Sequence, residues 1–246
     1  MNYQLVGDAA QAVLFQLQPG ENLRAPAAAL LFCNDAVSFE ARTQSGLAGG
    51  VARAVAGSVT GQSVSLAHFE CIAPGGMAAF AAPFAGKIQT LEIKETAWLC
   101  QRDSFLCASG NVLPEVAWAR RFGTGLFGGE GFALHRLNGE GTVWIQIGGA
   151  VIESTLDAGQ NLRVDAGCIA ALESTVSFDV EFSGGFKNSL MGGEGVFHAI
   201  LEGPGKVILQ THPLSRLAGR AHHASNIGGD PGHARNFGDI GTIFGA

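Results

Sequence analysis

Residues 137–146 read Leu-Asn-Gly-Glu-Gly-Thr-Val-Trp-Ile-Gln, and residues 201–210 read Leu-Glu-Gly-Pro-Gly-Lys-Val-Ile-Leu-Gln. A Gly-Gly-Glu-Gly segment precedes each stretch, at 128–131 and again at 192–195. Both segments shift by the same 64 residues, from 128 to 192 and from 137 to 201. Similarity at one fixed spacing indicates a duplicated structural unit, so this stretch decides which fold we expect.

A second similarity extends the duplication toward the N-terminus. Gly-Glu-Asn-Leu-Arg at 20–24 returns as Gly-Gln-Asn-Leu-Arg at 159–163, and Val-Ser-Phe at 37–39 returns at 176–178. Together the two spacings predict three tandem β repeats and a Gly-rich C-terminal tail, with bounds at residues 1–86, 87–149, 150–212 and 213–246.

Apolar and polar residues alternate through these repeats. The stretch 175–182 reads Thr-Val-Ser-Phe-Asp-Val-Glu-Phe, and Val143, Ile145 and Ile147 recur with the same period. A period of two indicates half-buried strands. Glycine supplies 36 of the 246 residues and interrupts the runs, which is typical of turns and bulges. With no convincing long amphipathic helix before residue 213, the pattern predicts an all-β protein of sandwich or barrel type.

A repeat of about 65–75 residues is too small to cover its own hydrophobic face well. We therefore expect the three repeats to pack together around a pseudo-threefold axis. Only 15 % of the residues are charged, so we also expect a homo-oligomer that buries further surface between subunits. The alternative is that the low charge only reflects many β-strands.

Composition excludes several classes of function. A net charge of −6 with no basic stripe argues against nucleic-acid binding, which needs Lys and Arg against the phosphates. Five cysteines without a CxxC pair argue against a disulfide framework or a zinc ribbon. The four that lie in apolar strand-like runs are expected to be buried thiols, which fits a reducing compartment; they are Cys33, Cys100, Cys107 and Cys168. The N-terminus has no signal-peptide pattern, and no apolar run approaches the roughly 20 residues of a membrane helix. We expect a cytoplasmic location.

Two short motifs suggest cofactor or metal chemistry and are interpreted otherwise. Residues 123–128 match GxGxxG, but glycine and a strand pattern follow in place of a helix, so dinucleotide binding is not favoured. His222, His223, Asp230 and His233 carry metal-binding atoms, but their spacing matches no standard site and a solvated tail is favoured.

Other side chains offer weaker routes to a site. Glu130 and Glu194 occupy matching repeat positions, so pseudo-symmetry could bring two carboxylates together and raise one pKa, although hairpin carboxylates in water are favoured. His135 and His198 lie beside the repeated hairpins and are expected to be surface or satisfied histidines. The tryptophans could line a small-molecule cleft but are more often core or interface residues; they are Trp98, Trp118 and Trp144. We therefore assign no catalytic, cofactor-binding or metal-binding residue.

The repeated motifs resemble those of the AIM24 family. The resemblance rests on 128–132, 139–146 and 192–195 continuing to 211, together with Asn-Leu-Arg-Val-Asp-Ala-Gly at 161–167. It implies several copies of a fold related to the Trp RNA-binding attenuation protein, a short double-stranded β-helix or β-sandwich. It implies no established reaction, and the eukaryotic relatives are associated with organisation of the mitochondrial inner membrane. RNA binding does not follow, because this chain lacks the basic repeats.

Three functions stay open at this point. The first is a non-enzymatic scaffold or binding protein, favoured by the duplicated architecture and the lack of a coherent catalytic set. The second is a small-ligand or metal sensor with a site between repeats. The third is a membrane-associated organiser acting through the tail, which is expected to contact a membrane surface or a protein partner. In the tail, a turn or two of helix can form from Leu214, Arg216, Leu217 and Arg220.

Overall fold

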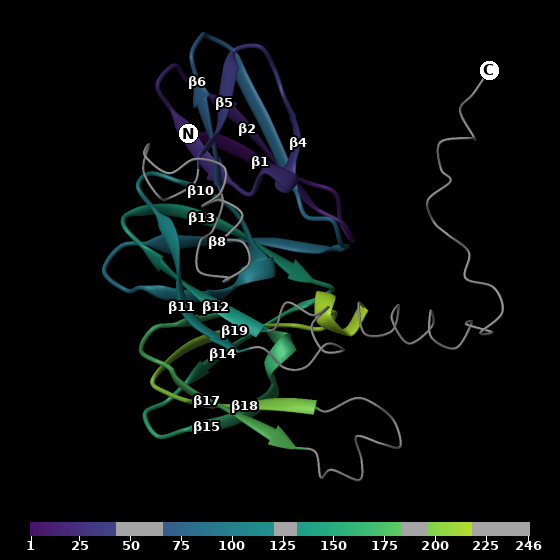
Figure 1. Ribbon diagram of the computed structural model, residues 1–246, viewed down its shortest axis with the longest axis vertical. Coiled ribbons are helices and arrows are strands. Elements are labelled where there is room, and N and C mark those ends of the chain that lie inside the picture. Colours follow the sequence, from purple (N-terminus) through teal and green to yellow (C-terminus); the bar gives the residue numbers. More distant parts are fainter. Residues whose placement is uncertain (43–65, 121–131, 184–195, 218–246) are drawn as a thin grey trace, which may run out of the picture.

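The computed structural model of the protein describes residues 1–42, 66–120, 132–183 and 196–217, and most of their secondary structure is β-strand (Figure 1). The Gly-Gly-Glu-Gly segments with Glu130 and Glu194, the GxGxxG match, and the histidines of the tail lie outside the described residues. The short helix expected near the tail is confirmed over residues 214–217.

The described strands form four antiparallel sheets. The first sheet has the order β1-β2-β7-β4. Its strands are β1 (Asn2–Val6), β2 (Ala12–Leu17), β7 (Gly76–Ala81) and β4 (Leu30–Cys33). The second sheet has the order β5-β6-β3-β10-β13-β8. Its strands are β5 (Val37–Arg42), β6 (Leu66–Cys71), β3 (Asn22–Ala25), β10 (Phe105–Ser109), β13 (Gly141–Gly148) and β8 (Gly86–Ile93).

The third sheet has the order β11-β12-β9-β16-β19-β14, and the fourth has the order β15-β18-β17. The third contains β11 (Leu113–Arg120), β12 (Phe132–Asn138), β9 (Trp98–Gln101), β16 (Ile169–Glu173), β19 (Gly205–Gln210) and β14 (Val151–Leu156). The fourth contains β15 (Asn161–Asp165), β18 (Val196–Glu202) and β17 (Ser177–Ser183). Short 3-10 turns precede β4, β10 and β16; they are η1 (Ala27–Ala29), η2 (Arg102–Ser104) and η4 (Ala166–Cys168).

The four sheets follow one another along the long axis of the molecule. Figure 1 shows β1, β2 and β4 at one end and β15, β17 and β18 at the other. Three hydrophobic clusters fill the spaces between successive sheets, with Phe69, Ile145 and Leu201 among their fully buried members. The first and last sheets are far apart, so the described chain does not close around the pseudo-threefold axis that we expected from the sequence.

The all-β expectation is confirmed, and its physical basis is the period-two pattern. In β13, Val143, Ile145 and Ile147 are completely buried, as their alternation predicts. Trp144 and Gln146 on the opposite face are buried as well, because β13 lies within a sheet that has hydrophobic clusters on both faces. Glycine closes the preceding turn: Gly139 and Gly141 have φ of 107° and 151°, a conformation that side chains with a Cβ rarely adopt.

Strand β1 covers one side of the hydrophobic cluster between the first and second sheets. The Tyr3 ring meets the rings of Trp144 and Phe15 with centroid separations of 5.1 and 6.1 Å. Its hydroxyl lies 3.3 Å from Thr90 Oγ1 of β8. The N-terminal amine forms an ion pair with Glu21 at 2.7 Å. These contacts hold the N-terminal strand across the boundary between the first and second sheets.

We predict that Tyr3→Ala lowers the free energy of unfolding by about 1–2 kcal/mol, because two aromatic contacts and partly buried ring area are lost. Tyr3→Phe keeps the ring and loses only the exposed hydroxyl contact, so it should stay within about 0.5 kcal/mol of the wild type. Urea unfolding followed by fluorescence measures both. Equal stability of Tyr3→Ala and wild type would show that β1 does not seal the core.

Candidate functional site: a groove beside strand β8

A groove of about 600 Å³ lies where β8 faces β14 and β19. Trp98 contributes apolar surface, and Leu91 and Ile208 do the same from the two sides. The remaining lining is mostly polar. The groove is lined by residues 89–92, 94–96, 98, 153–155, 173 and 206–208.

The backbone edge of β8 runs along this groove. Strand β8 is the last strand of its sheet, and among the described residues no strand pairs with its outer edge. The first part of the edge is covered by Gln11, whose backbone N–H donates to Gly86 O at 3.1 Å and whose Oε1 accepts from Ile88 N at 2.7 Å. Outward-facing residues alternate along an edge strand. The backbone groups of Thr90 and Glu92 therefore face the groove.

A side-chain hydrogen bond links the two walls of the groove. Gln89 Nε2 donates to Glu153 Oε1 at 2.8 Å, linking β8 to β14. Gln89 Oε1 is buried and has no hydrogen-bond partner among the described residues. A buried acceptor without a partner is costly. The groove thus offers the backbone edge of β8 to whatever enters it.

The charge of the groove is negative. Its lining holds four glutamates and two lysines, namely Glu92, Glu95, Glu153, Glu173, Lys94 and Lys206. Glu92 Oε1 accepts from Thr142 Oγ1 at 3.0 Å, and Glu173 Oε2 accepts from Lys206 N at 2.8 Å. A net excess of carboxylates favours a ligand that carries positive charge.

The three tryptophans have separate environments. Trp98 lines the groove, so a cleft-lining role is supported for this residue. Trp144 is buried, 1 % exposed, under Tyr3. Trp118 packs against Phe132 and Phe178, each at a ring separation of 5.6 Å. The structure therefore does not bring the three indoles into one site.

The expectation of surface or satisfied histidines is wrong for His135. Its side chain is only 3 % exposed, and Nδ1 has no hydrogen-bond partner among the described residues. His198 Nδ1 is also buried without a partner there. Burial, followed by the positive charge of Arg102, lowers the pKa of His135 to about 4. His135 is therefore neutral at physiological pH.

We predict that acid destabilises the protein through His135. Its folded pKa lies below the ordinary 6.5, so its contribution is present above pH 6.5 and is lost as the pH falls toward 4. The full loss amounts to about 3 kcal/mol. Comparing urea unfolding at neutral pH and near pH 5, His135→Gln should show a smaller drop in stability than the wild type. An identical drop in both proteins would contradict the assignment.

The cysteines are all reduced thiols. Cys71, Cys100 and Cys107 are buried, whereas Cys33 and Cys168 are partly exposed, so the prediction of buried thiols holds for Cys100 and Cys107 but not for Cys33 and Cys168. Burial raises the pKa of Cys107 well above its ordinary value, which keeps the thiol protonated. Within the described ranges, no three His, Cys, Asp or Glu side chains gather as a metal-binding group would require.

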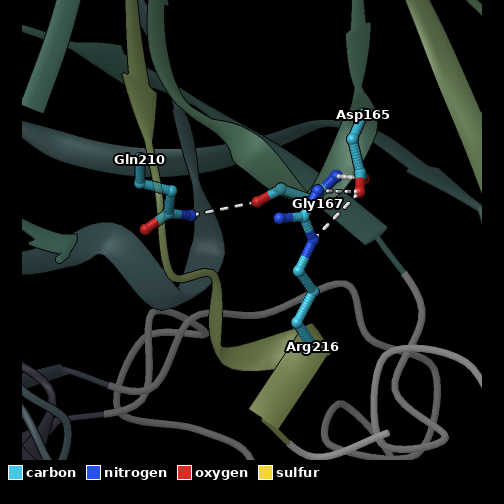
Figure 2. A network of polar contacts seen from close by, with 4 residues as sticks. All are labelled: Asp165, Gly167, Gln210 and Arg216. Carbon is cyan, nitrogen blue, oxygen red and sulfur yellow. Dashed lines mark hydrogen bonds and ion pairs between the residues drawn. The ribbon is translucent and has the colours of Figure 1, made fainter. Parts of the chain in front are cut away.

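A buried amide organises the other end of β19. Gln210 Nε2 donates to Gln101 Oε1 at 2.7 Å and to Gly167 O at 3.1 Å, while its Oε1 accepts from Gly148 N at 3.0 Å. Figure 2 shows the continuation of this network toward the tail. Asp165 accepts from Gly167 N at 2.9 Å and from Arg216 Nη2 at 2.8 Å, which anchors the helix at 214–217.

We predict that Gln210→Leu costs about 2–4 kcal/mol, because it leaves a buried N–H and two buried carbonyl oxygens without partners. Asn138→Leu is the matched control, since Asn138 only bonds to exposed Glu115 at 2.7 Å. The control should change stability by less than about 0.5 kcal/mol. Chemical denaturation measures the difference; equal effects of the two substitutions would show that the amide network is not a structural requirement.

Sequence reasoning did not find the groove, because no motif marks it. Its walls come from residues that are far apart in the chain, such as Trp98 and Lys206. Within the described residues, no helix is long and apolar enough to span a membrane.

The fold and the groove define an all-β protein with several antiparallel sheets and an open strand edge. The chain belongs to the AIM24 family, because the family model described as "Mitochondrial biogenesis AIM24" matches residues 3–212. The family expected from the repeated motifs is thereby confirmed. Its relation to the Trp RNA-binding attenuation protein stays a prediction.

Two relatives from streptococci extend the comparison. The uncharacterized protein M6_Spy0233 of Streptococcus pyogenes serotype M6 is 28 % identical over 145 residues, which cover 58 % of this chain and 57 % of that protein. The chain thus matches little more than half the length of that relative. The X-ray crystal structure of protein SPYM3_0169 from Streptococcus pyogenes has a TM-score of 0.72 and 22 % identity, covering 91 % of this chain and 99 % of that one. This likeness shows a shared fold.

Proposed function

We propose that this protein is a non-enzymatic scaffold of three tandem β units, and that its groove beside β8 binds an extended segment of a protein partner. The observation that carries the proposal is the position of β1. Strand β1 pairs with the outer edge of β2. Strand β8 corresponds to β2, and the groove lies at its outer edge, where no described strand pairs.

The division into three units is supported by the strand pairing. The order β2-β7-β4 recurs six strands later as β8-β13-β10 and again as β14-β19-β16. The pairs β4 with β7, β10 with β13 and β16 with β19 each contain a register shift at the matching position. The shifts lie between Leu30 and Phe32, between Phe105 and Cys107, and between Ile169 and Ala171. Bulges are specific features of a strand pair, so three at one place favour three copies of one unit.

The correspondence between β1 and the groove follows from this alignment. Strand β1 pairs with β2, with Tyr3 opposite Phe15. It then reaches the next unit at Thr90 and Trp144. One unit further along, the counterparts of Thr90 and Trp144 are Glu153 and Ile208, and both line the groove. A strand added to β8 would therefore contact Glu153 and Ile208, just as Tyr3 of β1 contacts Thr90 and Trp144.

The groove also sets the chemistry of its partner. Backbone pairing with Thr90 and Glu92 needs an extended segment, the recognition mode of β-strand addition. Leu91, Trp98 and Ile208 favour an apolar side chain in the segment, and the excess of glutamates favours Lys or Arg beside it. A non-enzymatic role is supported because Glu92, Glu153 and Glu173 are all engaged as hydrogen-bond acceptors, Glu153 across the groove and the other two within their own sheets.

Thr90→Pro tests this mode of binding. Proline removes the N–H that faces the groove and is tolerated on an edge strand when the ladder on the other side is intact. Thr90→Val is the matched control, since it keeps the N–H; both variants lose the Tyr3 contact. Linear peptides selected from a phage-displayed random library should bind wild type and Thr90→Val, and should lose at least about tenfold in affinity with Thr90→Pro, as loss of a backbone pair implies.

Selected peptides should alternate apolar and polar residues and carry net positive charge. Peptides that bind all three proteins equally would contradict strand addition at β8. A small cationic molecule that binds in the groove, with no peptide selected, would favour the ligand-sensor alternative. The membrane-associated alternative rests on the tail at 213–246, of which residues 218–246 lie outside the described residues. Turnover of a substrate abolished by one groove substitution would overturn the non-enzymatic role.

A further inference from the structure

Strand β4 is an apolar strand at an open edge. It reads Leu-Leu-Phe-Cys and pairs with β7 on one side only among the described residues. Leu31 and Phe32 are 58 % and 45 % exposed. The corresponding residues of β10, Leu106 and Cys107, are 1 % and 0 % exposed. Apolar edge strands are templates for pairing with another chain.

The counterparts of β4 are buried because each pairs with a strand of the preceding unit. Strand β10 pairs with β3, with Ala108 opposite Arg24. Strand β16 pairs with β9 in the same register, with Leu172 opposite Leu99 and Ala171 opposite Cys100. Each unit therefore joins the next through one antiparallel strand pair. Strand β4 is the first in this series, and no strand of the described residues pairs with its outer edge.

The complementary edge lies at the far end of the molecule. Strand β15 corresponds to β3 and β9, and it pairs with β18 on one side only among the described residues. Its sequence, Asn-Leu-Arg-Val-Asp, repeats the Asn-Leu-Arg of β3. Figure 1 shows β4 and β15 near opposite ends of the long axis, so one chain cannot join them.

We propose that β4 of one copy pairs with β15 of a second copy, as β10 pairs with β3 and β16 with β9. The internal pairs give the register: Cys33 lies opposite Arg163, and Phe32 opposite Val164. The inference uses the equivalence of the three units proposed above, but it does not depend on the groove. The interface joins two different surfaces, so it propagates head to tail and ends only when the copies close into a ring.

Burial supports a second copy as the occupant. A cavity of about 310 Å³ lies on the first sheet and extends from β1 and β2 to Phe32 of β4. It is lined by Leu14, Phe32 and Met77 together with parts of β1. The counterparts of Phe32 and Leu31 in the third unit, Ala171 and Ala170, are fully buried by the preceding unit. The same covering from a second copy removes these apolar side chains from water.

Arg163→Cys tests the register directly. Directly opposed residues of antiparallel strands have Cα atoms about 4.5–5.5 Å apart, within the range of a disulfide. Under mild oxidation, the natural thiol of Cys33 should link to the thiol introduced at position 163 of the next copy. Non-reducing gels should then show a ladder of covalent multimers that collapses to single chains on reduction.

The matched control is the double variant Cys33→Ser with Arg163→Cys, which should show no ladder. The double variant Leu31→Lys with Phe32→Lys should also prevent assembly. Native mass spectrometry of the purified full-length variant should then show the mass of a single chain. Both positions are exposed in the single chain, so the substitutions leave its core unchanged. A wild type that stays single at every concentration tested, or a ladder that persists without Cys33, would overturn the proposal. Either of these two outcomes would leave peptide binding at Thr90 unchanged, so the groove proposal is tested separately.

Discussion

Backbone pairing between edge strands is the constraint on which the rest of this structure depends. A small antiparallel sheet cannot cover both its faces and its edges. Here β3 pairs with β10 and β9 pairs with β16, so neighbouring three-stranded sheets merge into six-stranded ones. Hydrophobic clusters then form between successive sheets, and each merged sheet is apolar on both faces.

The same constraint explains why the molecule has distinct ends and an open groove. The pairs β3 with β10 and β9 with β16 join the sheets in series, while β4 and β15 each pair on one side only among the described residues. Along the side, β1 covers the edge of β2, and Gln11 covers the start of the edge of β8. The remainder of that edge opens into the groove. The proposed partner segment and the proposed second copy therefore meet one chemical need at two places, the pairing of backbone groups on apolar edge strands.

Buried polar groups fix how the sheets meet. Gln210 reaches Gln101, Gly167 and Gly148, which come from three separate parts of the chain. Because an unpaired amide inside the protein is costly, this arrangement favours one relative position of the sheets over others that bury similar apolar area. Asp165 accepts a hydrogen bond from Arg216, which fixes the position of the short helix after β19.

Local patterns in the sequence were enough for the strands, their turns and the spacing of the similar segments. Val143, Ile145 and Ile147 lie in a strand, as their period of two predicted, and Gly139 and Gly141 form the turn before it. The family followed from the same glycine-rich hairpins. Burial of His135 could not be predicted, since its neighbours on β12 give no sign that Arg102 and the strand of Cys100 pack beside it. The groove could not be predicted either, because Trp98 and Lys206 are brought together only by the pairing of whole sheets.

The sequence by itself determined that this is an all-β protein with similar segments at fixed spacing, because side-chain alternation and glycine turns act over a few residues. Tertiary structure alone decided whether those segments close around an axis or extend in a series. That choice depends on which edges pair, and every edge strand carries similar backbone donors and acceptors whatever its side chains. Contacts between distant residues, such as Ala108 with Arg24 and Leu172 with Leu99, select the series and leave the two ends exposed.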